Sequence, residues 1–197
     1  LGTGFINLGL AGRKIAVIGE NSYEWIITYL AVVNGTGVVV PLDRELPPHE
    51  IVNLLKRAKA SAIVYSPKLE NTIMEILPEL DMIEYTICMK ERPASADCSG
   101  SGKENAPASD IKGSMTLSGI MEMGRKAIEN GDKRFTDAVI DREAMCTLLF
   151  TSGTTGMAKG VMLSHKNISQ NVYNMSKYVK IAEGGIGLSV LPMHHSY

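Results

Sequence analysis

Short apolar runs rich in β-branched residues alternate along this chain with segments whose apolar residues recur at helical spacing. The runs are Lys14–Gly19, Gly37–Pro41, Ser61–Ser66 and Glu84–Met89. Each run is continuous rather than alternating between apolar and polar residues, which is typical of strands buried on both faces. Because strands and helices alternate, the sequence predicts an α/β fold with a mostly parallel β-sheet flanked by helices.

The segments between the runs carry the start and stop signals of helices. Asn21 and Glu24 have the spacing of an N-cap and its reciprocal acid, so we expect a helix that begins at Asn21 and ends at Gly35. Pro47 suits the start of the second helix. Apolar residues on one face predict a third helix over Leu69–Leu80.

The composition changes between residues 90 and 114. Ser, Ala, Gly, Pro and charged residues dominate this stretch, and Ile111 is its only aliphatic side chain larger than alanine. Such a segment buries too little apolar surface to offset the entropy of ordering it, so we expect a mobile insertion loop at about residues 90–114. Helical spacing then returns over Thr116–Asn130.

Charge and cysteine content exclude several kinds of protein. The 20 Lys and Arg residues nearly balance the 21 Asp and Glu residues, so we expect no nucleic-acid partner. Cys88, Cys98 and Cys146 are too scattered for a disulfide framework, which favours a cytoplasmic location. No apolar run reaches the roughly 18 residues of a spanning helix, so we expect no transmembrane segment, and peripheral membrane contact stays open.

The strongest chemical signal lies between two predicted strands, Met145–Phe150 and Val161–Leu163. The ten residues from Thr151 to Gly160, TSGTTGMAKG, contain four hydroxyls, three glycines and one lysine. Glycines let successive backbone N–H groups converge on an anion, and Lys159 adds a positive charge. An ordinary hairpin turn needs only about two to five residues. The sequence therefore predicts a loop that binds a polyphosphate.

The spacing of this loop differs from that of a Walker A loop. Ala158 stands where the second glycine of that motif would be, and Lys159 is followed by glycine rather than by Ser or Thr. The next element is predicted to be a strand, so no helix N-terminus is expected to face the phosphates.

The segment TSGTTGMAKGVMLSH resembles the phosphate loop and following strand of the adenylate-forming enzymes, which include acyl-CoA synthetases, luciferases and the adenylation domains of peptide synthetases. Ala158 departs from the proline that is usual in this family. The segment RKIAVIGENSYEWIITYLAVVNGTGVVVPLDRELPPHEI resembles the family's first strand–helix–strand unit, and GLSVLPMHHSY resembles its strand with the pattern L-P-x-x-H-x-[FY]. The wording is most similar to that of bacterial long-chain fatty acid–CoA ligases.

The resemblance implies the truncated N-terminal portion of an AMP-binding domain over residues 1–197, in the acyl-CoA synthetase/luciferase-like fold, without the C-terminal domain. It implies ATP-dependent activation of a carboxylic acid, a long-chain fatty acid in the most similar branch, through an acyl-adenylate that is then transferred to CoA. ATP, Mg²⁺ and CoA would take part. Because the family's adenine-binding, ribose-binding and C-terminal catalytic motifs are not found in this sequence, we expect the fragment alone to be inactive.

The resemblance also implies roles for individual residues. Lys159 and His195 would be catalytic, and His195 and Tyr197 would border the substrate. The phosphates would be bound by Thr151, Ser152, Gly153, Thr154, Thr155, Gly156 and Lys159. Two alternatives stay open: an amino-acid adenylation domain that feeds a carrier protein, and a non-catalytic nucleotide-binding module.

The four histidines do not predict a metal site. His194 and His195 are adjacent, and adjacent side chains on a strand point to opposite faces, so the pair cannot chelate one ion without a bend. We expect His195 to face the substrate pocket, and His194 to pack or to face solvent.

Overall fold

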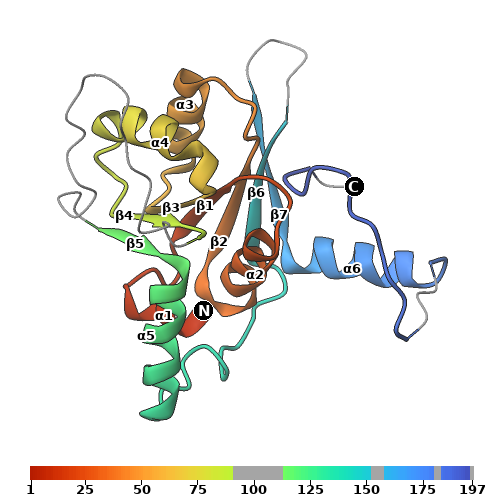
Figure 1. Ribbon diagram of the computed structural model, residues 1–197. Coiled ribbons are helices and arrows are strands. Elements are labelled where there is room, and N and C mark those ends of the chain that lie inside the picture. The colour runs from red at the N-terminus through yellow and green to blue at the C-terminus, as the bar shows by residue number, and fades with distance from the viewer. Residues whose placement is uncertain (91–112, 152–157, 180–182, 196–197) are drawn as a thin grey trace.

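The computed structural model describes residues 1–90, 113–151, 158–179 and 183–195. Within these ranges seven strands form one sheet in the order β5-β4-β3-β1-β2-β6-β7 (Figure 1). All neighbouring pairs are parallel except β6 and β7, which are antiparallel. The strands are β1 Lys14–Ile18, β2 Val38–Leu42, β3 Ala62–Tyr65, β4 Tyr85–Cys88, β5 Ser114–Thr116, β6 Met145–Thr151 and β7 Lys159–Ser164. The predicted α/β fold with a mostly parallel sheet is confirmed.

Helices pack on both faces of the sheet (Figure 1). The core on one face includes side chains of α3 and α4, and the core on the other includes side chains of α1, α2 and α5. The helices are α1 Gly2–Asn7, α2 Tyr23–Ala31, α3 Pro48–Ala58, α4 Glu70–Ile76, α5 Leu117–Glu129 and α6 His165–Ser176.

Strand β1 shows why both faces must be covered. Ile15 and Val17 belong to one core and Ala16 and Ile18 to the other, and none of the four is exposed. Each large apolar side chain that is fully buried contributes about 1.5–3 kcal/mol. A strand without a polar face therefore requires a helix on each side.

Two predicted helices differ from the observed ones at their ends. Helix α2 is capped by Ser22, whose hydroxyl accepts a hydrogen bond from the backbone N–H of Trp25 at 3.1 Å, so the predicted N-cap Asn21 is wrong by one residue. The helix continues into a wide turn over Val32–Thr36, in which Gly35 has φ +131°. That conformation suits glycine and ends the helix near the predicted residue.

The third predicted helix is interrupted. Leu69–Leu80 contains α4 only between Glu70 and Ile76, and a short 3₁₀ turn over Leu77–Glu79 follows it. Pro78 lies in that turn. Proline has no backbone N–H to donate and its ring clashes with the preceding turn, so the α-helix stops before it.

Only the ends of the predicted insertion loop at about residues 90–114 fall among the described residues. Residues 91–112 lie outside the described residues, but Ser114–Thr116 forms β5, which pairs with β4 at the edge of the sheet. Only Met115 is a large apolar residue in this strand, so its sequence carries little strand signal. Thr116 then caps α5 by accepting a hydrogen bond from the N–H of Gly119 at 3.2 Å.

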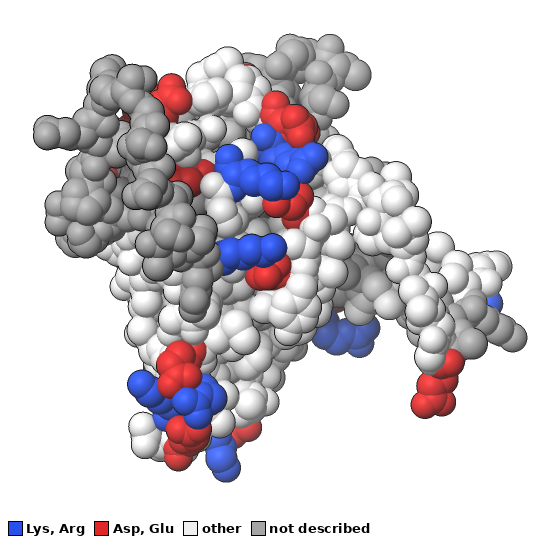
Figure 2. All heavy atoms as spheres, viewed as in Figure 1, with Lys and Arg blue, Asp and Glu red and all other residues white. Residues whose placement is uncertain are grey.

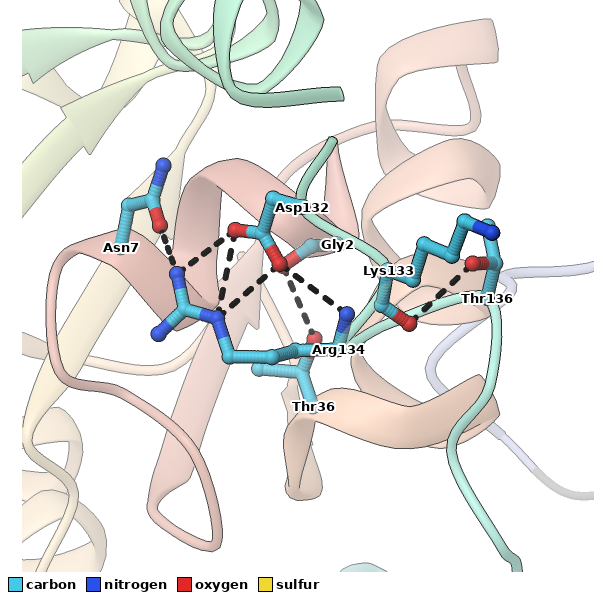
Figure 3. Close-up of polar contacts among 7 residues, drawn as sticks. All are labelled: Gly2, Asn7, Thr36, Asp132, Lys133, Arg134 and Thr136. Carbon is cyan, nitrogen blue, oxygen red and sulfur yellow. Dashed lines mark hydrogen bonds and ion pairs between the residues drawn. The ribbon is translucent and has the colours of Figure 1, made fainter. Parts of the chain in front are cut away.

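Polar contacts tie α1 to two distant segments (Figure 3). The Arg134 guanidinium donates to Asp132 Oδ2 at 2.6 Å and also to the side-chain oxygen of Asn7. The hydrogen bonds from Arg134 lower the pKa of the Asp132 carboxyl to about 2. The hydroxyl of Thr36 donates to the carbonyl oxygen of Gly2 at 3.5 Å. These contacts join α1 to the segments after α5 and α2.

Charged side chains of both signs lie close together on the surface. On the face shown in Figure 2, Lys and Arg adjoin Asp and Glu rather than forming a basic stripe. Arg125 for example pairs with Glu122 and Glu129, each at 2.7 Å. Within the described ranges, none of the helices combines the length and apolar character needed to cross a bilayer.

Helices α1 and α5 cross with their backbones nearly in contact. A Cβ atom on Gly124 would lie 2.8 Å from the backbone nitrogen of Gly4, and one on Gly4 would meet the backbone oxygen of Ile120. Backbone atoms within helices cannot move aside as a flexible side chain can. Both positions therefore require glycine.

We expect Gly124→Ala to lower the free energy of unfolding by about 1–3 kcal/mol, because the clash with α1 outweighs the roughly 1 kcal/mol that alanine gains in a helix interior. Urea denaturation measures this change. Gly119→Ala in the same helix is the matched control, since its Cβ would meet the side-chain oxygen of Thr116 at 3.3 Å rather than a backbone. Equal losses in the two variants would contradict the argument.

Candidate functional site

The predicted phosphate loop connects two adjacent antiparallel strands. Strand β6 ends at Thr151 and β7 begins at Lys159, and these two residues are paired in the ladder (Figure 1). The prediction that a strand, rather than a helix, follows the loop is confirmed. Thr151 and Lys159 are both exposed. The ladder thus holds the two ends of the loop at a fixed separation, with a cation at one of them.

Several predicted site residues lie outside the described residues. For the loop they are Ser152, Gly153, Thr154, Thr155 and Gly156, and at the C-terminus Tyr197. Their roles remain predictions.

The base of the hairpin is anchored on the core that contains α3. Phe150, on β6, and Ala158, just before β7, are partly buried there. The guanidinium of Arg57 on α3 lies over the Phe150 ring, 5.4 Å from its centroid. This cation–π contact fixes the ring and brings a second positive charge close to the end of β6.

An apolar cavity of about 720 Å³ lies on the opposite face, between α2, α6 and strands β6 and β7. Its apolar lining includes Trp25, Leu30, Leu149, Leu163, Ile168 and Met193, and its polar lining includes Thr147, Asn167, Asn171 and His195. A volume of this order and a mostly apolar wall with few polar groups are typical of sites for small molecules. The arrangement suits an apolar ligand with one polar end.

Tyr29 gives this cavity one rigid wall. Its ring stacks on Trp25 with centroids 5.6 Å apart, and its hydroxyl shares a hydrogen bond with the hydroxyl of Thr147 at 3.1 Å. Burial raises the pKa of the Tyr29 phenol, so the group stays protonated. Both rings lie on the helix expected between Asn21 and Gly35, but its sequence gave no sign of their place in a cavity.

The segment that ends in the two histidines does not form the expected strand. Residues 185–190 have no regular secondary structure and are exposed, and residues 193–195 lie in a turn. Asn21 holds this segment: its amide donates to the carbonyl oxygens of Ser189 at 3.4 Å and Leu191 at 2.7 Å, and its side-chain oxygen accepts from the N–H of Met193 at 3.0 Å. These contacts occupy the side chain that was expected to cap α2.

The turn brings the two histidine rings to the same place, contrary to the expectation for a strand. Their centroids are 4.3 Å apart, and His194 Nε2 lies 3.5 Å from the carboxylate of Asp43. Burial lowers the pKa of His194, although the negative charge of Asp43 opposes the shift. His195 is more exposed and lines the apolar cavity, whereas the His194 side chain is largely buried.

Asn21 and Asp43 both lie at the carboxyl edge of the sheet. Asn21 comes shortly after β1, and Asp43 follows β2 directly. The chain passes from β1 to β2 on one side and then returns to β3 on the other side of β1. Such a switch in strand order creates a crevice at the carboxyl ends of the strands, where ligands bind in open α/β sheets.

The whole chain matches a known enzyme family. A family model described as AMP-binding enzyme matches residues 1–197. The chain is 26% identical over 188 residues to a chloroplastic long-chain-fatty-acid–acyl-carrier-protein ligase of Arabidopsis thaliana, covering 95% of this chain and 25% of that relative. It is 28% identical over 198 residues to a peroxisomal long-chain acyl-CoA synthetase of the same plant, covering 100% of this chain and 26% of that relative.

A solved structure shares the fold. A chain from Rhodopseudomonas palustris assigned as a long-chain-fatty-acid CoA ligase superimposes with a TM-score of 0.72 at 17% identity, covering 98% of this chain and 42% of that chain. Two curated relatives are much longer, and this chain spans about a quarter of the length of each.

We expect Asn21→Ala to release the segment around Met193, because it removes two hydrogen bonds to carbonyl oxygens and one from an N–H. Each contributes about 0.5–1.5 kcal/mol, so exchange of the Met193 amide hydrogen should accelerate at least about tenfold. Hydrogen exchange followed by mass spectrometry or NMR measures this rate. Asn21→Asp keeps the acceptor and should have a smaller effect, and Asn53→Ala, at an exposed position of α3, should have none. An unchanged rate in Asn21→Ala would show that the hydrogen bonds of Asn21 do not hold the segment.

Proposed function

Because the chain belongs to the AMP-binding enzyme family, we propose that the intact protein activates a long-chain fatty acid with ATP and transfers the acyl group to CoA. One observation carries this proposal. The hairpin of β6 and β7, whose strands meet at Thr151 and Lys159, borders an apolar cavity that His195 also lines. Leu149, two residues before the loop along β6, lines that cavity. The predicted phosphate loop and the apolar cavity would thus share strand β6.

The proposed reaction joins two anions, and this sets what the residues must do. The carboxylate of the acid attacks the α-phosphorus of ATP, pyrophosphate leaves, and an acyl-adenylate forms. Attack requires alignment of the two groups and neutralisation of their charges. Lys159 would hold the β- and γ-phosphates together with the loop residues before it, and so favour the departure of pyrophosphate.

Mg²⁺ would accompany ATP in this site. The ion prefers oxygen ligands and keeps several waters, so it needs few protein groups besides the phosphates. The exposed hydroxyl of Thr151 offers one such oxygen, which fits this requirement. When bound, the ion shares the negative charge of the phosphates.

The apolar cavity and the relatives support a fatty acid as the substrate. A chain of methylene groups gains about 0.8 kcal/mol for each group that it buries, and the cavity walls offer mostly apolar side chains. His195 would lie near the polar end of the acid. The two curated relatives are named for long-chain acyl groups but for different thiol acceptors, a carrier protein and CoA. We propose CoA, and assays with each acceptor distinguish the two.

The activity belongs to the intact protein in this proposal. That the 197-residue chain alone forms no acyl-adenylate stays a prediction, and so does the cytoplasmic location.

We expect Lys159→Ala in the intact protein to slow ATP–pyrophosphate exchange about 10²-fold, because one charge that stabilises the phosphates is lost. Lys159→Arg keeps the charge and should retain more activity. Lys166→Ala is the matched control, since Lys166 is an exposed lysine that pairs with Glu143 at 2.7 Å. Exchange at the wild-type rate in Lys159→Ala would refute the role of Lys159.

We expect Ile168→Trp to shift the preference of the intact protein toward shorter acids, because the indole ring is larger than the isoleucine side chain and fills part of the cavity. Exclusion of two methylene groups corresponds to a roughly tenfold loss in kcat/KM for the longest acids. A series of acids of increasing length measures the shift. Ser169→Trp places the same ring on an exposed neighbouring residue of α6 and should leave the series unchanged. If Ile168→Trp showed the same preference for acid length as the wild type, the cavity would not be the site of the acyl chain.

A further inference from the structure

We propose that Asp43, His194 and His195 bind one divalent transition-metal ion, with zinc as the best match. This site is separate from the Lys159 hairpin and lies where the carboxyl edge of the sheet meets the apolar cavity. The proposal does not depend on the ATP-dependent reaction.

The three side chains already converge. One ligand atom from each lies within 4.8 Å of the other two. His194 Nε2 is 3.5 Å from Asp43 Oδ2. In a tetrahedral zinc site with bonds of about 2.0–2.1 Å, neighbouring ligand atoms are roughly 3.3 Å apart, so this pair has nearly the required spacing. His195 is the exposed member of the three and approaches the other two from the solvent side.

The buried nitrogen of His194 supplies an independent argument. The His194 side chain is only 10% exposed, and its Nε2 is buried without a hydrogen-bond partner. A buried polar atom left without a partner costs about 1–3 kcal/mol. Coordination to a metal ion would satisfy this atom.

The carboxylate of Asp43 is oriented for the same purpose. Its Oδ1 accepts a hydrogen bond from the backbone N–H of Glu45 at 2.9 Å, while Oδ2 is the oxygen nearest to His194. Such outer hydrogen bonds hold metal ligands in position. The positive charge of Arg44 lies nearby, but its guanidinium pairs with Glu45 at 2.9 Å, which offsets part of its repulsion.

The chemistry of the ligands favours zinc over magnesium. Two imidazole nitrogens and one carboxylate oxygen form a set that zinc binds and magnesium does not prefer. Three protein ligands leave a fourth position for water or for a molecule in the cavity.

Titration of the metal-free protein with Co²⁺ tests the site, because four-coordinate Co²⁺ absorbs visible light and octahedral Co²⁺ in water absorbs only weakly. We expect one equivalent to bind with visible absorption and to be displaced by one equivalent of Zn²⁺. His194→Gln and Asp43→Asn should each weaken binding at least tenfold. His49→Gln is the matched control, since His49 is 78% exposed and lies outside the cluster.

Several results would overturn the proposal. They are the absence of stoichiometric binding by the wild type, wild-type affinity in His194→Gln, and an equal loss in His49→Gln. Circular dichroism checks that each variant folds, and the exposed position makes His195→Gln the substitute if a buried variant does not fold. ATP is absent from this assay, so its failure would leave the role of Lys159 untouched.

Discussion

The central strands of the sheet have no polar face, and the rest of the structure follows from this constraint. Alternate residues of β1 are buried in two different cores, so helices must cover both sides. The crossovers that supply those helices reverse direction at β1, with β2 on one side of it and β3 on the other. The same reversal opens the crevice at the carboxyl edge, where Asn21 and Asp43 lie. Burial of apolar side chains therefore determines where polar chemistry can gather.

The antiparallel pair at the end of the sheet serves a different purpose. A parallel connection needs a crossover of a dozen or more residues, whereas an antiparallel pair can be joined directly. Strands β6 and β7 form such a pair, and their ladder includes Thr151 and Lys159, the residues on either side of the predicted phosphate loop. Phe150 and Ala158 fix the base of this hairpin in the core. The cavity beside it uses Leu149 and Leu163 from the same two strands.

Local sequence predicted the parts whose structure is decided locally. The four buried runs became strands because their apolar character is continuous. Strands also flank the predicted phosphate loop, but β6 includes Thr151 and β7 includes Lys159 and Gly160, so both strands extend into the predicted loop. Errors arose where distant contacts decide. Asn21 is a good N-cap by propensity, yet its partners lie about 170 residues away. For the same reason the histidine pair was placed on a strand, and its approach to Asp43 was invisible in the sequence.

The hydrogen bonds of Asn21 to residues 189–193 have a consequence for the order in which the chain folds. During synthesis the N-terminal strands leave the ribosome first, and domains generally fold in that direction. Strands β1, β2 and β3 find partners within a short stretch of chain. The side chain of Asn21 instead forms its hydrogen bonds with Ser189, Leu191 and Met193, at separations of 168, 170 and 172 residues, so they can form only after those residues are synthesised. A nascent chain can thus pair β1, β2 and β3 well before the residues that Asn21 binds have been synthesised.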